Sequence, residues 1–84
     1  MSRAHFTIKI FSVLQDRLGT DALEIEQESS LSVRDLVDEA CKQYPKLEAY
    51  RSFFRVAVNL EYAQDDDRVS ADDEVAILMP ASGG

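Results

Sequence analysis

Alternating apolar and polar residues predict two strands in the first part of the chain. Every second position is apolar over residues 6–11, and the same alternation returns over residues 23–26. A period of two places one side of each strand against a core and the other side in solvent. Between these strands, Ser12 and Gln15 match a capping box and Gly19 is suited to end a helix, so we predict a short helix there.

Apolar residues at helical spacing predict a longer helix in the middle of the chain. Its apolar face comprises Val33, Leu36, Val37, Ala40, Cys41 and Tyr44, which follow the i, i+3, i+4, i+7 pattern. Ser32 and Asp35 are placed as a second capping box at its start. Leu31 and Leu36 are placed as a hydrophobic staple, and Pro45 prevents the helix from continuing beyond Tyr44. Both ends of this helix are therefore predicted by local sequence.

The second half of the chain predicts two further strands and a short edge strand. Residues 46–52 fit a helical turn, and residues 54–59 alternate as a third strand. Asn59–Leu60 is a candidate turn, followed by a short edge strand at Tyr62–Ala63. The last strand, residues 74–79, is apolar on both faces, which is typical of a central strand covered on both sides.

This order of elements predicts an α+β fold, a ubiquitin-like β-grasp. Its mixed sheet has four to five strands, with one main helix packed across it. A chain of 84 residues forms one domain, which we place at residues 1–80, with residues 81–84 as a flexible tail. The core is predicted to include Ile8, Ile10, Leu36, Val37, Val58, Val75 and Ile77.

Composition and charge limit the classes of partner that the chain can bind. The net charge of -7 disfavours nucleic acid and anionic lipid surfaces, which attract clustered Lys and Arg, and favours a basic protein surface. No apolar run approaches the roughly 20 residues that span a bilayer, so we expect a cytoplasmic protein without membrane association. Cys41 is the only cysteine, which excludes an internal disulfide and fits a reducing compartment.

Few side chains are candidates for chemistry. Cys41 shares the apolar face of the main helix and is predicted to be an inert core residue. His5 has no second His or Cys to form a metal site or a nucleophile pair, so we expect an exposed strand residue. Asp65–Asp67 lacks the glycine and the distant glutamate of a calcium loop and is predicted to be a solvated loop. The chain also has no phosphate-binding glycine loop, so we expect it to bind no cofactor and not to use ATP by itself.

The strongest chemical candidate is the Gly83–Gly84 pair at the end of the sequence. Two of the three glycines in the chain are these last residues. Residues without side chains let a backbone enter a narrow channel and present its carboxylate to another enzyme. A frayed or truncated terminus is the alternative explanation of the same two residues.

Three segments of the last third resemble a known family. They are Val56–Asn59, Asp73–Ala76, and Pro80 followed by Ser82–Gly84. Together they look like the small, sulfur-carrying subunit of molybdopterin synthase, the MoaD-type proteins. The likeness also includes the opening strand and the helix end at Arg17–Gly19, so it covers nearly the whole chain, although only the last third is specific.

Two positions depart from that family. Asp72 stands where the family commonly has glycine, and because Asp tolerates the left-handed turn conformation better than most residues, we expect the turn to persist. Met79–Pro80 stands where the family commonly has two prolines, so the exit of the tail should be less rigid.

The resemblance implies a mechanism and two partners. A ubiquitin-activating-type adenylyltransferase uses ATP to convert the carboxylate of Gly84 to an acyl adenylate, and sulfur then replaces the adenylate to give a thiocarboxylate. Ala81, Ser82 and Gly83 complete the tail, which enters the large catalytic subunit of a heterotetrameric synthase and delivers sulfur to a pyranopterin precursor. The small subunit itself is expected to be non-catalytic.

A docking surface is predicted from the apolar residues that lie near the tail. It comprises Tyr62, Leu78, Met79 and Pro80, and we expect it to bind the large subunit.

Three alternative functions stay open at the level of sequence. One is a carrier that donates sulfur for the thiazole of thiamin, which shares the fold and the Gly-Gly tail. Another is a ubiquitin-like protein modifier linked to lysines of its targets, including modifiers that also thiolate transfer RNA. The third is a plain β-grasp interaction domain whose terminal glycines have no role.

Overall fold

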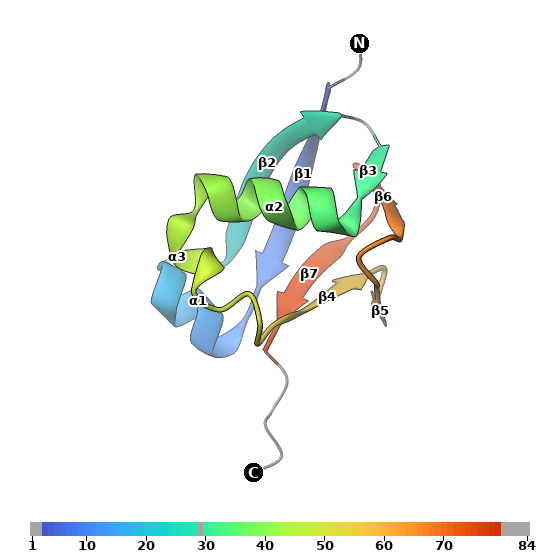
Figure 1. The fold of residues 1–84 in the computed structure, drawn as a ribbon. Helices are drawn as coiled ribbons and strands as arrows, with labels where there is room; N and C mark the ends of the chain where they lie inside the picture. The colour runs from blue at the N-terminus through green and yellow to red at the C-terminus, as the bar shows by residue number, and fades with distance from the viewer. Residues whose placement is uncertain (1–2, 29, 80–84) are drawn as a thin grey trace.

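A mixed five-stranded sheet with one long helix across one face dominates the structure (Figure 1). The computed structural model describes residues 3–28 and 30–79. The strand order is β2-β1-β7-β4-β5, in which only β1 and β7 are parallel, and β3 pairs with β6 in a separate two-stranded sheet. The elements are β1 (Arg3–Ile10), α1 (Ser12–Leu18), β2 (Ala22–Glu28), β3 (Ser30–Ser32), α2 (Val33–Gln43), α3 (Pro45–Glu48), β4 (Arg55–Val58), β5 (Glu61–Tyr62), β6 (Arg68–Ser70) and β7 (Val75–Leu78). This arrangement confirms the predicted α+β β-grasp fold.

The first three elements follow the predicted order, with one correction at the start of α1. β1 begins earlier than the alternation indicated, at Arg3, and pairs with β2 along its whole length. Phe11 occupies the N-cap position of α1 and Ser12 is the first helical residue, so the capping box predicted at Ser12 is wrong. Gly19 ends the helix as predicted, with φ of 74° and its N–H donating to the carbonyl of Gln15 at 2.9 Å.

Helix α2 begins and ends where the sequence predicts. The hydroxyl oxygen of Ser32 accepts a hydrogen bond from the Asp35 N–H at 3.1 Å, which satisfies one of the unpaired donors of the first turn. Tyr44 is the C-cap, and Pro45 opens the short helix α3 within the segment expected to form a helical turn. The face predicted to be apolar is the face that is buried in the core cluster with the sheet.

The core joins this helix face to the inner face of the sheet. Six of the seven residues predicted for the core are buried in one cluster: Ile8, Ile10, Leu36, Val37, Val75 and Ile77. Val58, the seventh, is half-buried and packs against the cluster, because it is the last residue of β4 before the chain turns away from the helix. The described core therefore matches the apolar pattern closely.

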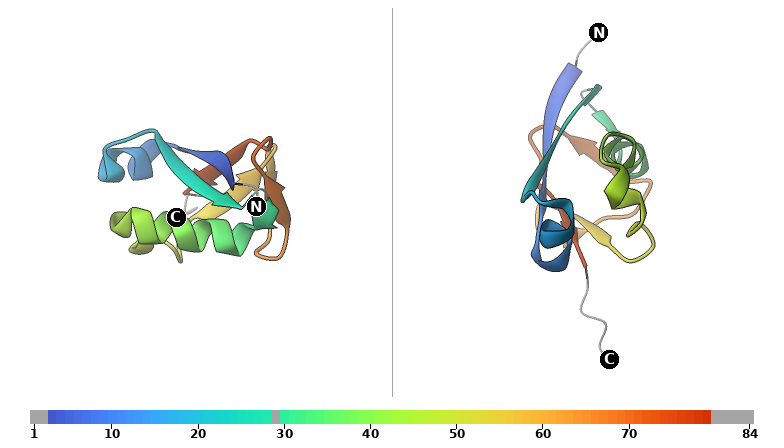
Figure 2. Two further views of the ribbon diagram at one scale, coloured as in Figure 1. Left: turned by 90° about the horizontal axis from the view of Figure 1, so that it is seen from above. Right: turned by 90° about the vertical axis from the view of Figure 1, so that its left-hand side faces the viewer.

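Strand β7 is central, but only one of its faces is covered. It lies between β1 and β4, as predicted. Val75 and Ile77 are buried under α2, whereas Ala76 and Leu78 point to the other face and are half-buried. Figure 2 shows α2 on one side of the sheet only. The prediction that β7 is covered on both sides is wrong, and its second face is available for a partner.

A tight hairpin joins β4 to the edge strand β5. Asn59 and Leu60 form its two-residue turn with φ of 54° and 72°, the left-handed values that a twisted hairpin requires. The predicted turn and edge strand are therefore confirmed, although β5 covers Glu61–Tyr62 rather than Tyr62–Ala63. Asn59 and Leu60 are the only non-glycine residues with positive φ in the described parts of the chain. The turn at Asp72 persists as expected, with the Asp73 N–H donating to the Ser70 carbonyl at 3.0 Å, and Asp72 does not need the left-handed conformation there.

The acidic loop at Asp65–Asp67 supports the start of α2. Its backbone carbonyls accept the N–H groups of Val33, at 2.9 Å from Asp67, and of Arg34, at 3.1 Å from Asp65. The first turn of a helix has N–H groups without intrahelical partners, so these bonds satisfy them. The loop prediction is confirmed. Across residues 3–28 and 30–79, no helix has the length and apolar character needed to cross a membrane.

Candidate functional site: an apolar hollow on the open face of the sheet

The open face of the sheet carries a hollow of about 370 Å³ beside the C-terminal strand. Strands β4, β5 and β7 and the hairpin turn supply its lining: Ala57, Leu60, Tyr62, Glu74, Ala76 and Leu78. Two of the four residues predicted as a docking surface, Tyr62 and Leu78, meet here. Five of its six lining side chains are apolar or aromatic, so the hollow suits an apolar group of a partner.

Strand register explains the shape of the hollow. Ala57 of β4 lies directly opposite Ala76 of β7 on one side and opposite Tyr62 of β5 on the other. Residues opposite one another across a sheet project from the same face. The two small alanine side chains therefore form the floor, while the larger Tyr62 and Leu78 form the rim.

The rim exposes large apolar side chains to water. Tyr62 is 67% exposed and Leu60 is 86% exposed. Leu60 also holds a left-handed backbone conformation that is uncommon for a residue with a branched side chain. Sequence reasoning assigned Leu60 to a turn only. Turn positions usually carry a polar residue or glycine. An apolar residue at such a position was the signal that could have assigned Leu60 to a binding surface.

Of the other predicted interface residues, the structure describes Met79 alone. Met79 packs against the buried core and does not line the hollow. Pro80 lies outside the described residues, as do the tail residues Ala81, Ser82, Gly83 and Gly84. Because β7 ends at Leu78, the hollow borders the strand that leads into that segment.

Charged side chains at the edge of the hollow form an ion pair and hydrogen bonds with neighbouring residues. Lys9 Nζ of β1 lies 3.4 Å from Glu74 Oε2, and both side chains are about half exposed. Asp73, the preceding residue, has a pKa below its usual value because its carboxylate accepts the Ser70 N–H and, secondly, a hydrogen bond from the Asn59 side chain. The Asp73 carboxylate is therefore ionised at neutral pH.

Cys41 is a core residue, as predicted. It is 7% exposed and contributes to the buried face of α2. Burial raises the pKa of its thiol to about 11, and a hydrogen bond with Glu48 acts in the same direction. A thiol that stays protonated at neutral pH is a poor nucleophile, so the geometry does not support a sulfur-carrying role for Cys41.

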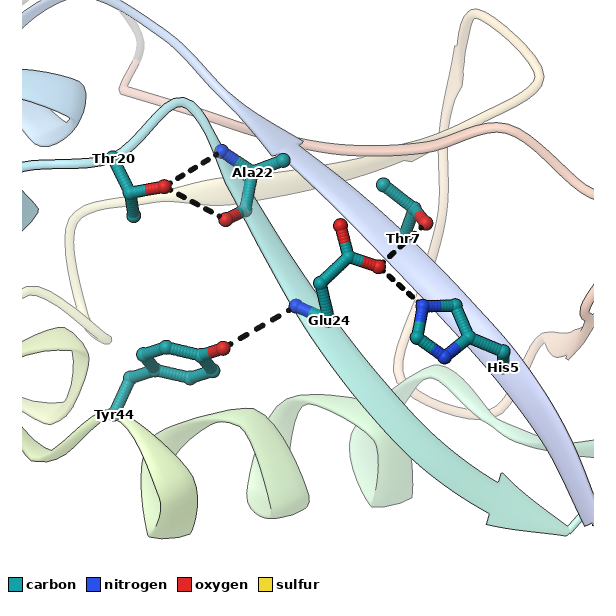
Figure 3. Close-up of polar contacts among 6 residues, drawn as sticks. All are labelled: His5, Thr7, Thr20, Ala22, Glu24 and Tyr44. Atoms are coloured by element: carbon teal, nitrogen blue, oxygen red, sulfur yellow. Dashed lines mark hydrogen bonds and ion pairs between the residues drawn. The ribbon is translucent and has the colours of Figure 1, made fainter.

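His5 is an exposed residue of β1, also as predicted, and it belongs to a polar cluster with β2 (Figure 3). Its Nε2 contacts Glu24 Oε1, and the Thr7 hydroxyl donates to the same oxygen at 3.0 Å. The pKa of Glu24 is lowered, first by the bond with His5 and then by that with Thr7. Within the part of the chain that the structure describes, no group of three His, Cys, Asp or Glu side chains could hold a metal ion.

Two side chains on the other side of β2 bond to its outer edge (Figure 3). The Thr20 hydroxyl donates to the carbonyl of Ala22 at 3.0 Å and accepts the Ala22 N–H at 3.4 Å. The Tyr44 hydroxyl accepts the N–H of Glu24 at 3.4 Å. Side chains that occupy backbone groups of an edge strand limit its pairing with other chains, so we interpret these contacts as structural.

The fold and the hollow define a small ubiquitin-like β-grasp protein with an apolar binding face beside its last strand. The chain belongs to the ThiS family, which matches residues 8–84. It is similar to a molybdopterin synthase sulfur carrier subunit of Arabidopsis thaliana, at 31% identity over 99% of this chain and 86% of that protein. A protein of the same name in Dictyostelium discoideum is 30% identical over 94% of this chain and 95% of its own length.

A solved structure shows the same fold. The small archaeal modifier protein 1 of Haloferax volcanii superposes with a TM-score of 0.85 and 25% identity, covering 96% of this chain and 100% of that one. The family match and the two curated relatives confirm the resemblance to sulfur-carrying subunits that the last third of the sequence indicated.

Proposed function

We propose that this chain is the sulfur carrier subunit of a molybdopterin synthase. The observation that carries the proposal is the likeness to two relatives of that name, at about 30% identity over nearly the whole chain. The family match supports it further, because it continues through the Ser82-Gly83-Gly84 sequence to residue 84. The reacting group in this proposal is the carboxylate of Gly84.

The proposed chemistry begins with activation of that carboxylate. A carboxylate is a poor electrophile until one of its oxygens becomes part of a good leaving group. An adenylating enzyme of the ubiquitin-activating type transfers the adenylyl group of ATP to the carboxylate oxygen, with release of pyrophosphate. Sulfide sulfur from a donor then attacks the acyl carbon and displaces AMP, which leaves a thiocarboxylate on Gly84.

Sulfur transfer takes place in the large subunit of the synthase. There the thiocarboxylate sulfur attacks a carbon of the pyranopterin precursor and displaces an oxygen substituent, and water then cleaves the acyl–sulfur bond, which returns the carboxylate of Gly84. Two such transfers complete a dithiolene. The described part of this chain offers no activated nucleophile, since its cysteine is buried and protonated. The partner therefore supplies the catalytic groups, while this chain supplies sulfur and a docking surface.

We assign docking to the apolar hollow. Tyr62, Leu60 and Leu78 expose apolar surface that a partner would remove from water, at about 25 cal/mol of stabilisation per Å² buried. Met79 and Pro80 continue the chain from β7 toward the tail and belong to the same proposed interface. Docking here brings β7, the strand that precedes these residues in the sequence, to the partner.

The proposal predicts that Leu78→Asp weakens binding to the large subunit by about 100-fold. The substitution removes an apolar contact and forces the complex to desolvate a carboxylate. The two free-energy costs together exceed about 2.7 kcal/mol, which corresponds to a 100-fold change in affinity. Isothermal titration calorimetry with the large subunit measures the effect. Ala49→Asp is the matched control, because it adds the same charge at an exposed position after α3.

The fold of the Leu78→Asp variant must be checked, since Leu78 lies in a central strand. A thermal melt serves for that purpose, and Tyr62→Ala on the exposed edge strand tests the same hollow without touching the core. Unchanged affinity in both folded variants would assign docking to another face.

A second candidate function is a protein modifier. The structural likeness to the small archaeal modifier protein 1 favours it. The two functions share activation of Gly84 and differ in the acceptor. Intact-mass spectrometry with an activating enzyme, ATP and a sulfur donor tests the shared step, and covalent conjugates of higher mass in a cell extract would identify the modifier.

A further inference from the structure

The hairpin that carries half of the hollow is held by few ladder contacts. Only two residue pairs, Ala57 with Tyr62 and Val58 with Glu61, join β4 to β5. The Ala63 N–H adds one bond to the carbonyl of Val56 at 2.9 Å. β4 itself pairs with β7 over four residue pairs, from Arg55–Leu78 to Val58–Val75, whereas β5 and the hairpin turn lie beyond this ladder and depend on further contacts.

Asn59, the first residue of the hairpin turn, provides such contacts. Its N–H donates to the carbonyl of Glu74 at 2.7 Å, and its Oδ1 accepts the Glu74 N–H at 2.9 Å. Its Nδ2 donates to Asp73 Oδ1 at 3.0 Å. Three hydrogen bonds therefore join one turn residue to the two residues that precede β7. Asparagine also tolerates the left-handed conformation that this position requires.

The Asp73 carboxylate extends these bonds to the turn after β6. Asp73 Oδ2 accepts the Ser70 N–H at 2.8 Å and lies 3.4 Å from the Ser70 hydroxyl. The Asp73 N–H donates in return to the Ser70 carbonyl at 3.0 Å. Because one of its oxygens bonds to Ser70 and the other to Asn59, the carboxylate links the hairpin to a turn that is itself closed by hydrogen bonds.

The two sides of the hollow depend on this linkage. Leu60 and Tyr62 project from the hairpin, whereas Ala76 and Leu78 project from β7. Asn59 is adjacent in sequence to Leu60, and its partner Glu74 itself lines the hollow. The β4–β7 ladder sets the floor of the hollow, and the bonds of Asn59 fix the hairpin turn that carries Leu60 against the start of β7.

We propose that Asn59 is a positioning residue of the docking face, whose side-chain amide fixes the β4–β5 hairpin against β7 so that the hollow is preformed for the large subunit. This inference rests on the proposed function, because it assigns the preformed hollow to that partner. A preformed surface loses less conformational freedom on binding than one that must be ordered.

The test exchanges the two side chains that face each other. Asn59→Asp keeps the size of the side chain, its tolerance of the left-handed conformation and its acceptor for Glu74, but replaces the Nδ2 donor by a charge facing Asp73. We expect the affinity for the large subunit to fall about tenfold at neutral pH, equivalent to about 1.4 kcal/mol. Asp73→Asn alone places two donors opposite each other and should weaken binding in the same direction.

The double variant Asn59→Asp with Asp73→Asn reverses the direction of the hydrogen bond. The new amide donates to the new carboxylate, and its oxygen is left to accept the Ser70 N–H. We expect affinity within about twofold of the original chain, because a pair that interacts directly is non-additive. If the double variant recovers the affinity, the losses in the single variants come from the broken hydrogen bond and not from a general loss of packing.

A pH profile gives a second readout. In Asn59→Asp the two facing carboxylates raise the pKa of the pair, so lowering the pH toward about 5 should protonate one of them and recover part of the affinity. The original chain should change less, because the pKa of Asp73 is lowered. Other charged side chains on these elements are Arg55, Glu61, Arg68, Asp72 and Glu74, which bonds to Lys9, and they are present in all the variants.

Hydrogen exchange of backbone amides follows the hairpin without any partner. In Asn59→Asp the amides of Glu74 and Ala63 should exchange at least about tenfold faster. The Ile10 amide, bonded to the Asp21 carbonyl in the β1–β2 region, should not change. Equal acceleration at Ile10 would show global destabilisation and overturn the local role of Asn59.

The outcomes separate this inference from the proposed function. Binding of the original chain to the large subunit, weakened by Asn59→Asp and restored in the double variant, supports both. Binding that is equal in the original chain and Asn59→Asp overturns the positioning role and leaves the function standing. An original chain that does not bind the large subunit at all contradicts the proposed function, and with it the role of Asn59.

Discussion

Deleting Gly84 is expected to abolish thiocarboxylate formation while leaving the thermal stability almost unchanged. The reason is chemical, because the proposed reaction takes place at the carboxylate of this residue, which must reach the pocket of the activating enzyme. Stability should persist because the described buried core extends from Phe6 to Ile77. Intact-mass spectrometry after incubation with the activating enzyme, ATP and a sulfur donor measures the oxygen-to-sulfur exchange, and calorimetry measures the melting temperature.

Variants extended by one residue at either end provide a matched test of this prediction. Adding one residue after Gly84 should also abolish the exchange, whereas adding the same residue before Met1 should have no effect. A side chain at Gly83 should slow the exchange, because a glycine pair enters a narrow channel more readily than a residue with a Cβ. Exchange that continues at full rate after deletion of Gly84 would disprove its assignment as the reacting residue.

The fate of the sulfur identifies the acceptor. Addition of the large subunit and the pyranopterin precursor should return the carrier to its original mass, because the sulfur leaves with the pterin. Exchange without this transfer would favour the thiazole carrier or the modifier. An absence of exchange with any cognate activating enzyme would contradict the carrier function in all its forms.

Leu36→Ala is expected to cost about 2–5 kcal/mol of the free energy of unfolding. Leu36 lies on the buried face of α2 and is 1% exposed. Its truncation removes apolar contacts between the helix and the inner face of the sheet and leaves a cavity that the surrounding side chains fill only in part. Urea unfolding followed by circular dichroism measures the change.

Leu60→Ala is the matched control for this substitution. It removes the same atoms from a side chain that is 86% exposed, so the change in unfolding free energy should lie within about 0.5 kcal/mol of zero. Binding to the large subunit should show the opposite order. Leu60→Ala should lose affinity for the partner, whereas the folded fraction of Leu36→Ala should keep its affinity. A loss near zero for Leu36→Ala would contradict the packing of α2 described above.

Local sequence was sufficient to determine the main helix and the inner face of the sheet. Ser32 caps α2 and Pro45 follows its end, and both effects depend only on residues within one helical turn. The alternation in β1 and β2 assigned their buried sides correctly, because a strand repeats every two residues whatever it pairs with. In β4 it did so only in part, since Ala57 on the opposite side is as buried as Val56. The central position of β7 also followed from its apolar composition.

Only the tertiary structure determined which surfaces remain open and which distant residues meet. β3 and β6 are three residues long, too short for an alternation to be recognised, and they exist because the loop before β6 binds the first turn of α2. The second face of β7 is open because all its apolar neighbours on that side come from one hairpin, which makes a hollow and not a core. Asn59 and Asp73 are 14 positions apart in sequence, and no local rule brings an amide to a carboxylate across that separation. The sequence determined each element through short-range periodicity and capping, whereas the docking face depends on strand order and register, which arise only when the elements pack together.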